Sequence, residues 1–155
     1  MLIRPINYNF SSRYGNAISF IVVHDTGNYH AGANAINHYK YFSGGNRNRS
    51  AHYFVDDREI VQIIDPKYAA WHCGDGTSRN GCNNLNSVGV ELCVNSDSNR
   101  IAAKGNLIRI VHFLMIKYNI PPERVVRHYD VTGKLCPRSM IDEDWAEWKT
   151  FRMAI

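Results

Sequence analysis

Two short apolar segments rich in β-branched residues constrain the fold of this chain most strongly. Residues 18–24 read ISFIVVH and residues 87–94 read SVGVELCV. Segments of this length and composition are typical of strands in the centre of a sheet. Each segment also carries one polar residue of chemical interest, His24 at the end of the first and Glu91 within the second.

Helical and hairpin patterns lie between and after these two predicted strands. The expected segments are helices at residues 31–42 and roughly 102–118, a β-hairpin over residues 52–65, a short strand over residues 123–128, and irregular chain at 43–50 and 66–86. Ser139 is expected to cap a last helix on which Trp145 and Trp148 face the sheet. Strands interleaved with helices predict the α/β class, with a mixed central β-sheet flanked by helices.

The length and the cysteine content suit one domain, spanning residues 1–155, that needs no disulfide framework. A chain of 155 residues can bury enough surface for a stable core. None of its four cysteines forms a C-x-x-C pair, which argues against a structural four-cysteine zinc site. Cys73 and Cys82 flank a glycine-rich loop and are candidates for pairing, whereas Cys93 has the surroundings of a buried residue. A reducing compartment is expected.

The charge favours anionic surroundings without identifying them. The chain has 18 basic and 14 acidic residues, for a net charge of +4. Arg47 and Arg49 form the densest basic group, and we interpret them as part of a solvated loop, with no nucleic acid as partner. No apolar run approaches the roughly 18 residues that cross a bilayer, so no membrane partner is expected.

Two histidines close apolar segments, His24 in IVVH and His128 in VVRH. Strand ends at the rim of an α/β sheet are where ligand sites form, because loops converge there. Cys136 follows His128 across a turn, and two imidazoles with one thiolate leave a fourth tetrahedral position open, as in catalytic zinc sites. Spacing alone does not select this set, since the chain has 7 histidines and 4 cysteines.

A lysine and a glutamate extend the candidate site. Lys134 stands two residues before Cys136 in GKLCP, which allows it to lie beside the same metal. Glu91 interrupts the apolar run GVELCV, and a buried carboxylate without a partner is costly. Strand alternation could simply turn Glu91 to solvent, or Glu91 could act as a general base for a water molecule. The sequence pattern does not decide between these two interpretations.

Five motifs in collinear order resemble the type-2 N-acetylmuramoyl-L-alanine amidases, a family of phage endolysins, bacterial autolysins and peptidoglycan recognition proteins. The matching segments are IVVHDTGN (21–28), SAHYFVDD (50–57), AWHCG (70–74), NSVGVELCV (86–94) and VVRHYDVTGKLCP (125–137). They cover most of the chain, and the last is the most specific. The resemblance implies a zinc-dependent amidase that cuts the amide between N-acetylmuramic acid and L-alanine in peptidoglycan.

The resemblance also implies roles for individual residues. The zinc ligands, for one Zn²⁺ per chain, would be His24, His128 and Cys136. The catalytic residues would be Glu91 and Lys134, and the substrate-binding residues Asp25, Thr26, Asn28 and His72, the last of which packing would explain almost as well. Some phage members of the family have a catalytic tyrosine where this chain has Ala51, and the nearest tyrosine is Tyr53. We therefore expect the base to be Glu91.

Three alternatives remain at this stage. A peptidoglycan-recognition module that binds without cutting is the nearest one, and the intact ligand set argues against it. A zinc deaminase would need H-x-E with P-C-x-x-C, which the chain lacks. A glycosidase would need two opposed carboxylates, and nothing in the sequence pairs them.

The N-terminal residues lack the apolar core of a signal peptide, so we expect synthesis in the bacterial cytoplasm and action on the cell wall after release. The chain is consistent with one module of a longer protein.

Overall fold

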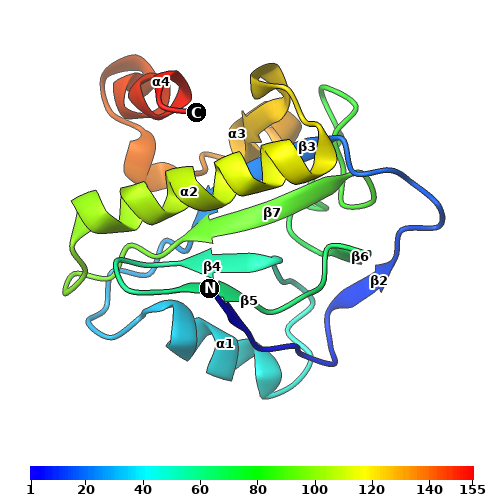
Figure 1. The fold of residues 1–155 in the computed structure, drawn as a ribbon, viewed down its shortest axis with the longest axis horizontal. Helices are drawn as coiled ribbons and strands as arrows, with labels where there is room; N and C mark the ends of the chain where they lie inside the picture. The colour runs from blue at the N-terminus through cyan, green and yellow to red at the C-terminus, as the bar shows by residue number, and fades with distance from the viewer.

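A six-stranded mixed sheet forms the centre of the computed structural model, which describes residues 1–155 (Figure 1). In sheet order the strands are β1 (Leu2–Ile3), β5 (Ile60–Gln62), β4 (Tyr53–Val55), β7 (Ser87–Leu92), β3 (Phe20–Asp25) and β8 (Val125–Arg127). Strand β3 lies between β7 and β8 and runs parallel to both. Strands β4 and β5 form an antiparallel hairpin. The two predicted central strands, the hairpin and the α/β class are therefore confirmed.

Helices cover both faces of the sheet. They are α1 (Ala35–Ser43), α2 (Arg100–Tyr118), α3 (His128–Thr132) and α4 (Ala146–Met153), with short 3-10 helices at Pro122–Arg124, Arg138–Met140 and Glu143–Trp145. Helix α2 lies along β7 on one face, and α1 lies against β4 and β5 on the other (Figure 1). The side chain of Asn99 caps α2 by accepting from the backbone N–H groups of Ile101 and Ala102, which are otherwise without partners. None of the helices combines the length and the apolarity needed to cross a membrane.

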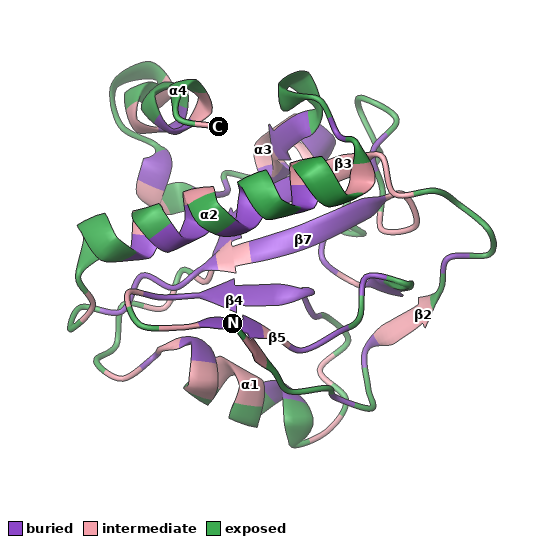
Figure 2. Ribbon diagram, in the orientation of Figure 1, coloured by how far each residue is buried: buried purple, intermediate pink, exposed green.

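Alternation along β3 and β7 divides the core between the two faces of the sheet. Ile21 and Val23 belong to the cluster that packs with Leu107 and its neighbours on α2. Val22 belongs to a separate cluster on the opposite face, and the strand period of two places His24 on that same face. Figure 2 shows the central strands largely buried and the outer side of α2 exposed. The carboxyl ends of β3 and β7 thus present His24 and Glu91 on the face away from α2.

Three short strands were not predicted. Strand β1 pairs in parallel with β5 at one edge of the main sheet. Strand β2 (Phe10–Ser12) pairs with β6 (Tyr68–Ala70) as an antiparallel ribbon beside the main sheet. The prediction that residues 66–86 are entirely irregular is therefore wrong. Strand β1 has only 2 residues, and β2 and β6 have 3 each. A three-residue strand is too short to show a period of two, so only its partner strand reveals it.

The predicted last helix begins later than expected, and Ser139 does not cap it. Ser139 lies in the 3-10 helix at Arg138–Met140, and its backbone N–H donates to the Asp25 carboxylate. Helix α4 begins at Ala146 after Trp145, whose φ is 61°, and the Asp142 carboxylate accepts from the backbone N–H of Glu147 at 3.1 Å. A tertiary contact to Asp25 therefore replaces the local cap.

The C-terminal aromatic residues and the cysteines occupy the core. Trp148 is buried with the α2 cluster, and Trp145 packs against it from just before α4. All four cysteines are buried and free, so Cys73 and Cys82 do not form a disulfide. Cys93 is 2% exposed, as expected for a small buried residue.

Candidate metal centre

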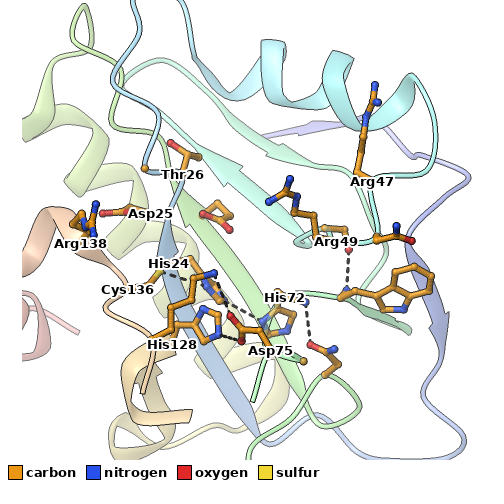
Figure 3. A pocket seen from close by; sticks show the side chains of 18 of the residues that line it. His24, Asp25, Thr26, Arg47, Arg49, His72, Asp75, His128, Cys136 and Arg138 are labelled. Atoms are coloured by element: carbon orange, nitrogen blue, oxygen red, sulfur yellow. Dashed lines mark hydrogen bonds and ion pairs between the residues drawn. The ribbon is translucent and has the colours of Figure 1, made fainter. Parts of the chain in front are cut away.

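Three potential metal ligands meet at the carboxyl edge of the sheet. His24 ends β3, and His128 directly follows the parallel neighbour β8 and opens α3. The loop after α3 brings Cys136 back to them, held by a hydrogen bond of 3.0 Å from the Tyr129 N–H to the Cys136 carbonyl. One ligand atom from each residue lies within 4.8 Å of the others, and all three residues are buried (Figure 3).

The distance between two of the ligand atoms and the unpaired nitrogen of His128 fit a tetrahedrally coordinated metal ion. His24 Nδ1 lies 3.8 Å from Cys136 Sγ. With zinc bonds of about 2.0–2.1 Å to nitrogen and 2.3 Å to sulfur, tetrahedral ligand atoms lie about 3.5 Å apart. His128 Nδ1 is buried and has no hydrogen-bond partner. An orphaned buried nitrogen at this position is what a metal ligand requires, so the group could hold a metal ion.

Burial sets the protonation of these residues. It lowers the pKa of His24 well below the usual value, and the neighbouring histidines lower it further. Burial also lowers the pKa of His128, against the opposing effect of Asp75. Both imidazoles are therefore neutral, as metal binding requires. Burial, with the charge of Glu91, raises the pKa of the Cys136 thiol, so a cation is needed to hold it as the thiolate.

Asp75 belongs to the site and was missed by the sequence analysis. Its Oδ1 accepts a hydrogen bond of 2.7 Å from His128 Nε2, and its Oδ2 lies 3.2 Å from Lys134 Nζ. Partial burial raises the pKa of Asp75, but His128 and Lys134 outweigh it and hold the pKa below the usual value. A carboxylate that holds the second nitrogen of a metal-binding histidine fixes its tautomer. The only signal in the sequence is an acid between two glycines, Gly74 and Gly76.

Glu91 faces the cleft beside the three ligands. It pairs with His24 in the register of β7 and β3, so the two side chains share one face of the sheet. Its Oε2 is buried without a hydrogen-bond partner. Burial raises the pKa of Glu91 to about 8, the charge of Asp25 adds to this, and Lys134 opposes it. Of the two interpretations left open above, the one in which Glu91 simply points to solvent is wrong.

Tyr53 cannot supply the tyrosine that is missing at position 51. Its side chain is fully buried with the α2 cluster, on the other face of the sheet from His24. Its hydroxyl donates to Gln62 Oε1 at 3.0 Å. Ala51 is itself buried. Glu91 therefore remains the candidate base.

The ligands and Glu91 line a cleft of about 860 Å³, which adjoins a second pocket of about 460 Å³ beside α1. Asp25 and Thr26 line both, Asn28 lines only the smaller, and His72 lines only the larger. Asp25 is 8% exposed, and its carboxylate is used by the Ser139 N–H. The Oγ1 atom of Thr26 is buried without a partner.

The Arg47–Arg49 segment lies closer to the site than expected. It lines the larger cleft rather than forming a loop directed only to solvent. Arg47 turns back to stack on Tyr41, with its guanidinium carbon 4.3 Å from the ring centre. Arg49 reaches towards the middle of the cleft (Figure 3) and lines both pockets. The cleft therefore carries a cation opposite the candidate ligands.

The sequence of this chain matches a known protein family. The family described as N-acetylmuramoyl-L-alanine amidase matches residues 14–139. The chain belongs to this family. Two relatives from Bacillus subtilis are the N-acetylmuramoyl-L-alanine amidases CwlH, 37% identical over 95% of this chain, and XlyA, 35% identical over 97%.

This amidase-family chain matches only part of those relatives but the whole of a solved domain. It spans about half of their length, 56% of CwlH and 48% of XlyA. The structure of the catalytic domain of XlyA is similar to it with a TM-score of 0.86 and 33% identity, covering 100% of this chain and 99% of that one. The chain therefore matches the catalytic domain of XlyA in extent and in fold.

Proposed function

We propose that this chain is a zinc-dependent N-acetylmuramoyl-L-alanine amidase that hydrolyses the amide between N-acetylmuramic acid and L-alanine in bacterial peptidoglycan. The observation that carries the proposal is the convergence of His24, His128 and Cys136 with Glu91 in one cleft. Membership of the amidase family supports the choice of this amide.

The donor set favours one zinc ion per chain. Two imidazoles and one thiolate suit zinc, and they leave one tetrahedral position for other molecules. A zinc ion held by His24, His128 and Cys136 would supply Lewis-acid chemistry, activating water at neutral pH and polarising a carbonyl.

Glu91 is proposed to move the proton during hydrolysis. Its carboxylate takes a proton from the attacking water and gives it to the alanine nitrogen as the C–N bond breaks. A group that must accept and donate in turn works best with a pKa near the working pH. The pKa of Glu91 in the metal-free site, about 8, lies close to neutral pH. Glu91 Oε2 has no hydrogen-bond partner in the protein that would compete for this proton.

Lys134 is proposed to stabilise the oxyanion that develops on the carbonyl. Its Nζ pairs with the exposed side of Asp75, and its side chain lines both pockets. Loss of one good oxyanion donor typically costs about 10²–10³ in turnover.

The polar rim is proposed to hold the glycopeptide. Thr26 and Asn28 are proposed to contact it, a role supported by the position of Thr26 in the lining of both pockets and of Asn28 in that of the smaller one. For Asp25 the structure favours an indirect part, because its carboxylate already binds the Ser139 N–H. The basic side chains of the cleft and the net charge of +4 favour approach to an anionic wall. Action on the wall would follow release from the cytoplasm in which we propose the chain is made.

Digestion of purified cell walls tests the proposal. The protein should release new N-terminal alanine. Glu91→Gln should slow the release by about 10²–10⁴-fold, whereas Glu123→Gln, at an exposed glutamate outside the cleft, should leave it unchanged. New reducing sugar ends would identify a glycosidase. Sedimentation with the walls without release of alanine would identify the binding module instead.

A further inference from the structure

Both ring nitrogens of His72 are engaged inside the protein. His72 Nδ1 lies 3.1 Å from His24 Nε2, and His72 Nε2 lies 3.1 Å from Ser87 Oγ. Only 8% of His72 is exposed, although the residue lines the cleft wall. Neither nitrogen is free for a ligand, so a direct hydrogen bond from His72 to substrate would first require breaking one of these contacts.

The direction of these hydrogen bonds is set at Ser87. Its Oγ lies 2.5 Å from the backbone carbonyl oxygen of Asn83, and two oxygens at that distance are joined by a hydrogen bond. A carbonyl only accepts, so the hydroxyl proton of Ser87 is donated to Asn83. The Ser87 oxygen is left to accept, which requires His72 Nε2 to carry its proton.

The proton on His72 Nε2 in turn fixes the position of the proton on His24. With the ring proton of His72 on Nε2, His72 Nδ1 accepts a hydrogen bond from the N–H at His24 Nε2. His24 Nδ1 then carries no proton and has a free lone pair. This nitrogen lies 3.8 Å from Cys136 Sγ. We propose that Ser87 and His72 are positioning residues that hold His24 in the Nε2–H tautomer with its Nδ1 lone pair directed at the metal. This inference rests on the proposed metal site.

The surrounding chain holds the His72 ring in place for this role. A Cβ at Gly89 on β7 would lie 2.6 Å from His72 Cγ, so the ring packs directly on the glycine backbone. The side-chain oxygen of Asn84 accepts from the backbone N–H groups of His72 and Cys73 at 3.0 and 2.8 Å. Ser87 is fully buried. The position of the ring is therefore fixed by β7 and by the segment around Asn84.

The two histidine ligands are thus oriented by different chemistry. His128 is held by the partly exposed carboxylate of Asp75, whereas His24 is held by a buried chain of hydrogen bonds through His72 to the Ser87 hydroxyl. A carboxylate at the buried position of Ser87 would carry a large desolvation cost, which a hydroxyl avoids. A chain that ends in a hydroxyl fixes the tautomer without adding a carboxylate to the site.

Nitrogen NMR of the metal-free, ¹⁵N-histidine-labelled protein tests the tautomers directly. We expect pyrrole-type signals from Nε2 and pyridine-type signals from Nδ1 for both His24 and His72. A proton on Nδ1 of His24 would overturn the proposal. Because this measurement needs neither metal nor substrate, its outcome is separate from that of the proposed amidase function.

Zinc affinity tests the consequence of the tautomer. Ser87→Ala should weaken zinc binding about 10–100-fold in competition with a chromophoric chelator, as loss of a ligand's hydrogen-bond partner does elsewhere. Ser87→Thr, which keeps the hydroxyl, should restore most of the affinity.

Ser50→Ala is the matched control. Ser50 is also buried, and its hydroxyl donates to the Asn9 carbonyl at 2.7 Å and accepts from the Trp71 N–H at 2.9 Å, so its hydrogen bonds do not involve the His72 ring. Its loss should leave zinc affinity unchanged. Equal zinc affinity in Ser87→Ala and the wild type would overturn the proposal, and so would an equal loss in both alanine variants.

Discussion

Glu91 shows how one residue is prepared by its surroundings for a single task. Its partner in the register is His24, its Oε2 is unpaired, and its pKa is raised to about 8. These three properties come from a strand end that faces a cleft, where burial and a free oxygen coexist. A similar carboxylate on an open surface would be ionised and hydrated.

Replacing Glu91 by glutamine should separate turnover from metal binding. Glu91→Gln should retain zinc and lose about 10²–10⁴-fold in the rate of alanine release, since general acid–base catalysis contributes that much. Tyr53→Phe should keep the rate and lose only about 1 kcal/mol of stability with its hydrogen bond to Gln62. A glutamine variant with wild-type turnover would remove Glu91 from the mechanism.

The raised pKa of Glu91 should also appear in the stability of the metal-free protein. The folded state binds this proton more tightly than the unfolded state, whose pKa is near 4.5. The stabilising contribution is therefore complete below pH 4.5 and is lost as the pH rises towards 8. The buried histidines act in the opposite sense, because their pKa values are lowered and their contribution is lost as the pH falls below 6.5.

Urea unfolding of wild type and Glu91→Gln isolates the glutamate, since the histidines are common to both. The difference in the free energy of unfolding should shift in favour of Glu91→Gln as the pH rises from 5 to 8. A difference that is independent of pH would mean that Glu91 titrates normally.

At the scale of elements, the site depends on the contact between β7 and the segment around His72. Gly89→Ala would place a Cβ 2.6 Å from the His72 ring, which is held on both sides. We expect a loss of about 1–3 kcal/mol in stability from overpacking, together with weaker zinc binding.

Gly105→Ala is the control for that substitution. Gly105 is exposed on α2, and a Cβ there would meet nothing within 4 Å. Alanine should stabilise the helix by about 0.5–1 kcal/mol and leave zinc binding alone. If both alanine variants bound zinc like the wild type, the packing of His72 on Gly89 would not matter to the site.

At the scale of the whole molecule, the largest core cluster is built without the metal ligands. Its 19 buried residues lie between the sheet, α2 and the C-terminal aromatic residues. The ligands lie on the other side, at strand ends and in a loop. The fold is therefore expected to persist when the metal is removed, unlike that of a zinc finger.

Chelation should abolish alanine release while the far-UV circular dichroism stays unchanged. Adding back zinc to 100 times its Kd should stabilise the protein by about 2.7 kcal/mol, which corresponds to roughly 5–10 °C in Tm for a chain of this size. Loss of secondary structure on chelation would show that the metal is structural as well.

Much of the architecture could be predicted from the chain alone. The central strands, the hairpin and α2 follow from apolar periodicity, because residues close in sequence decide them. The ribbon of β2 and β6 and the start of α4 could not be predicted. Each depends on a distant partner, and Ser139 N–H reaches Asp25 across 114 residues.

The sequence by itself determined which ligand types end the parallel strands: His24 and His128 close apolar segments, and parallel strands bring their carboxyl ends to one edge. Only the tertiary structure decided what each nitrogen faces. Asp75 meets His128 across 53 residues, His72 meets His24 across 48, and Cys136 meets His24 across 112. The reason is physical: a strand end follows from local pattern, whereas the direction of a hydrogen bond in a buried site depends on every partner that the fold brings to it.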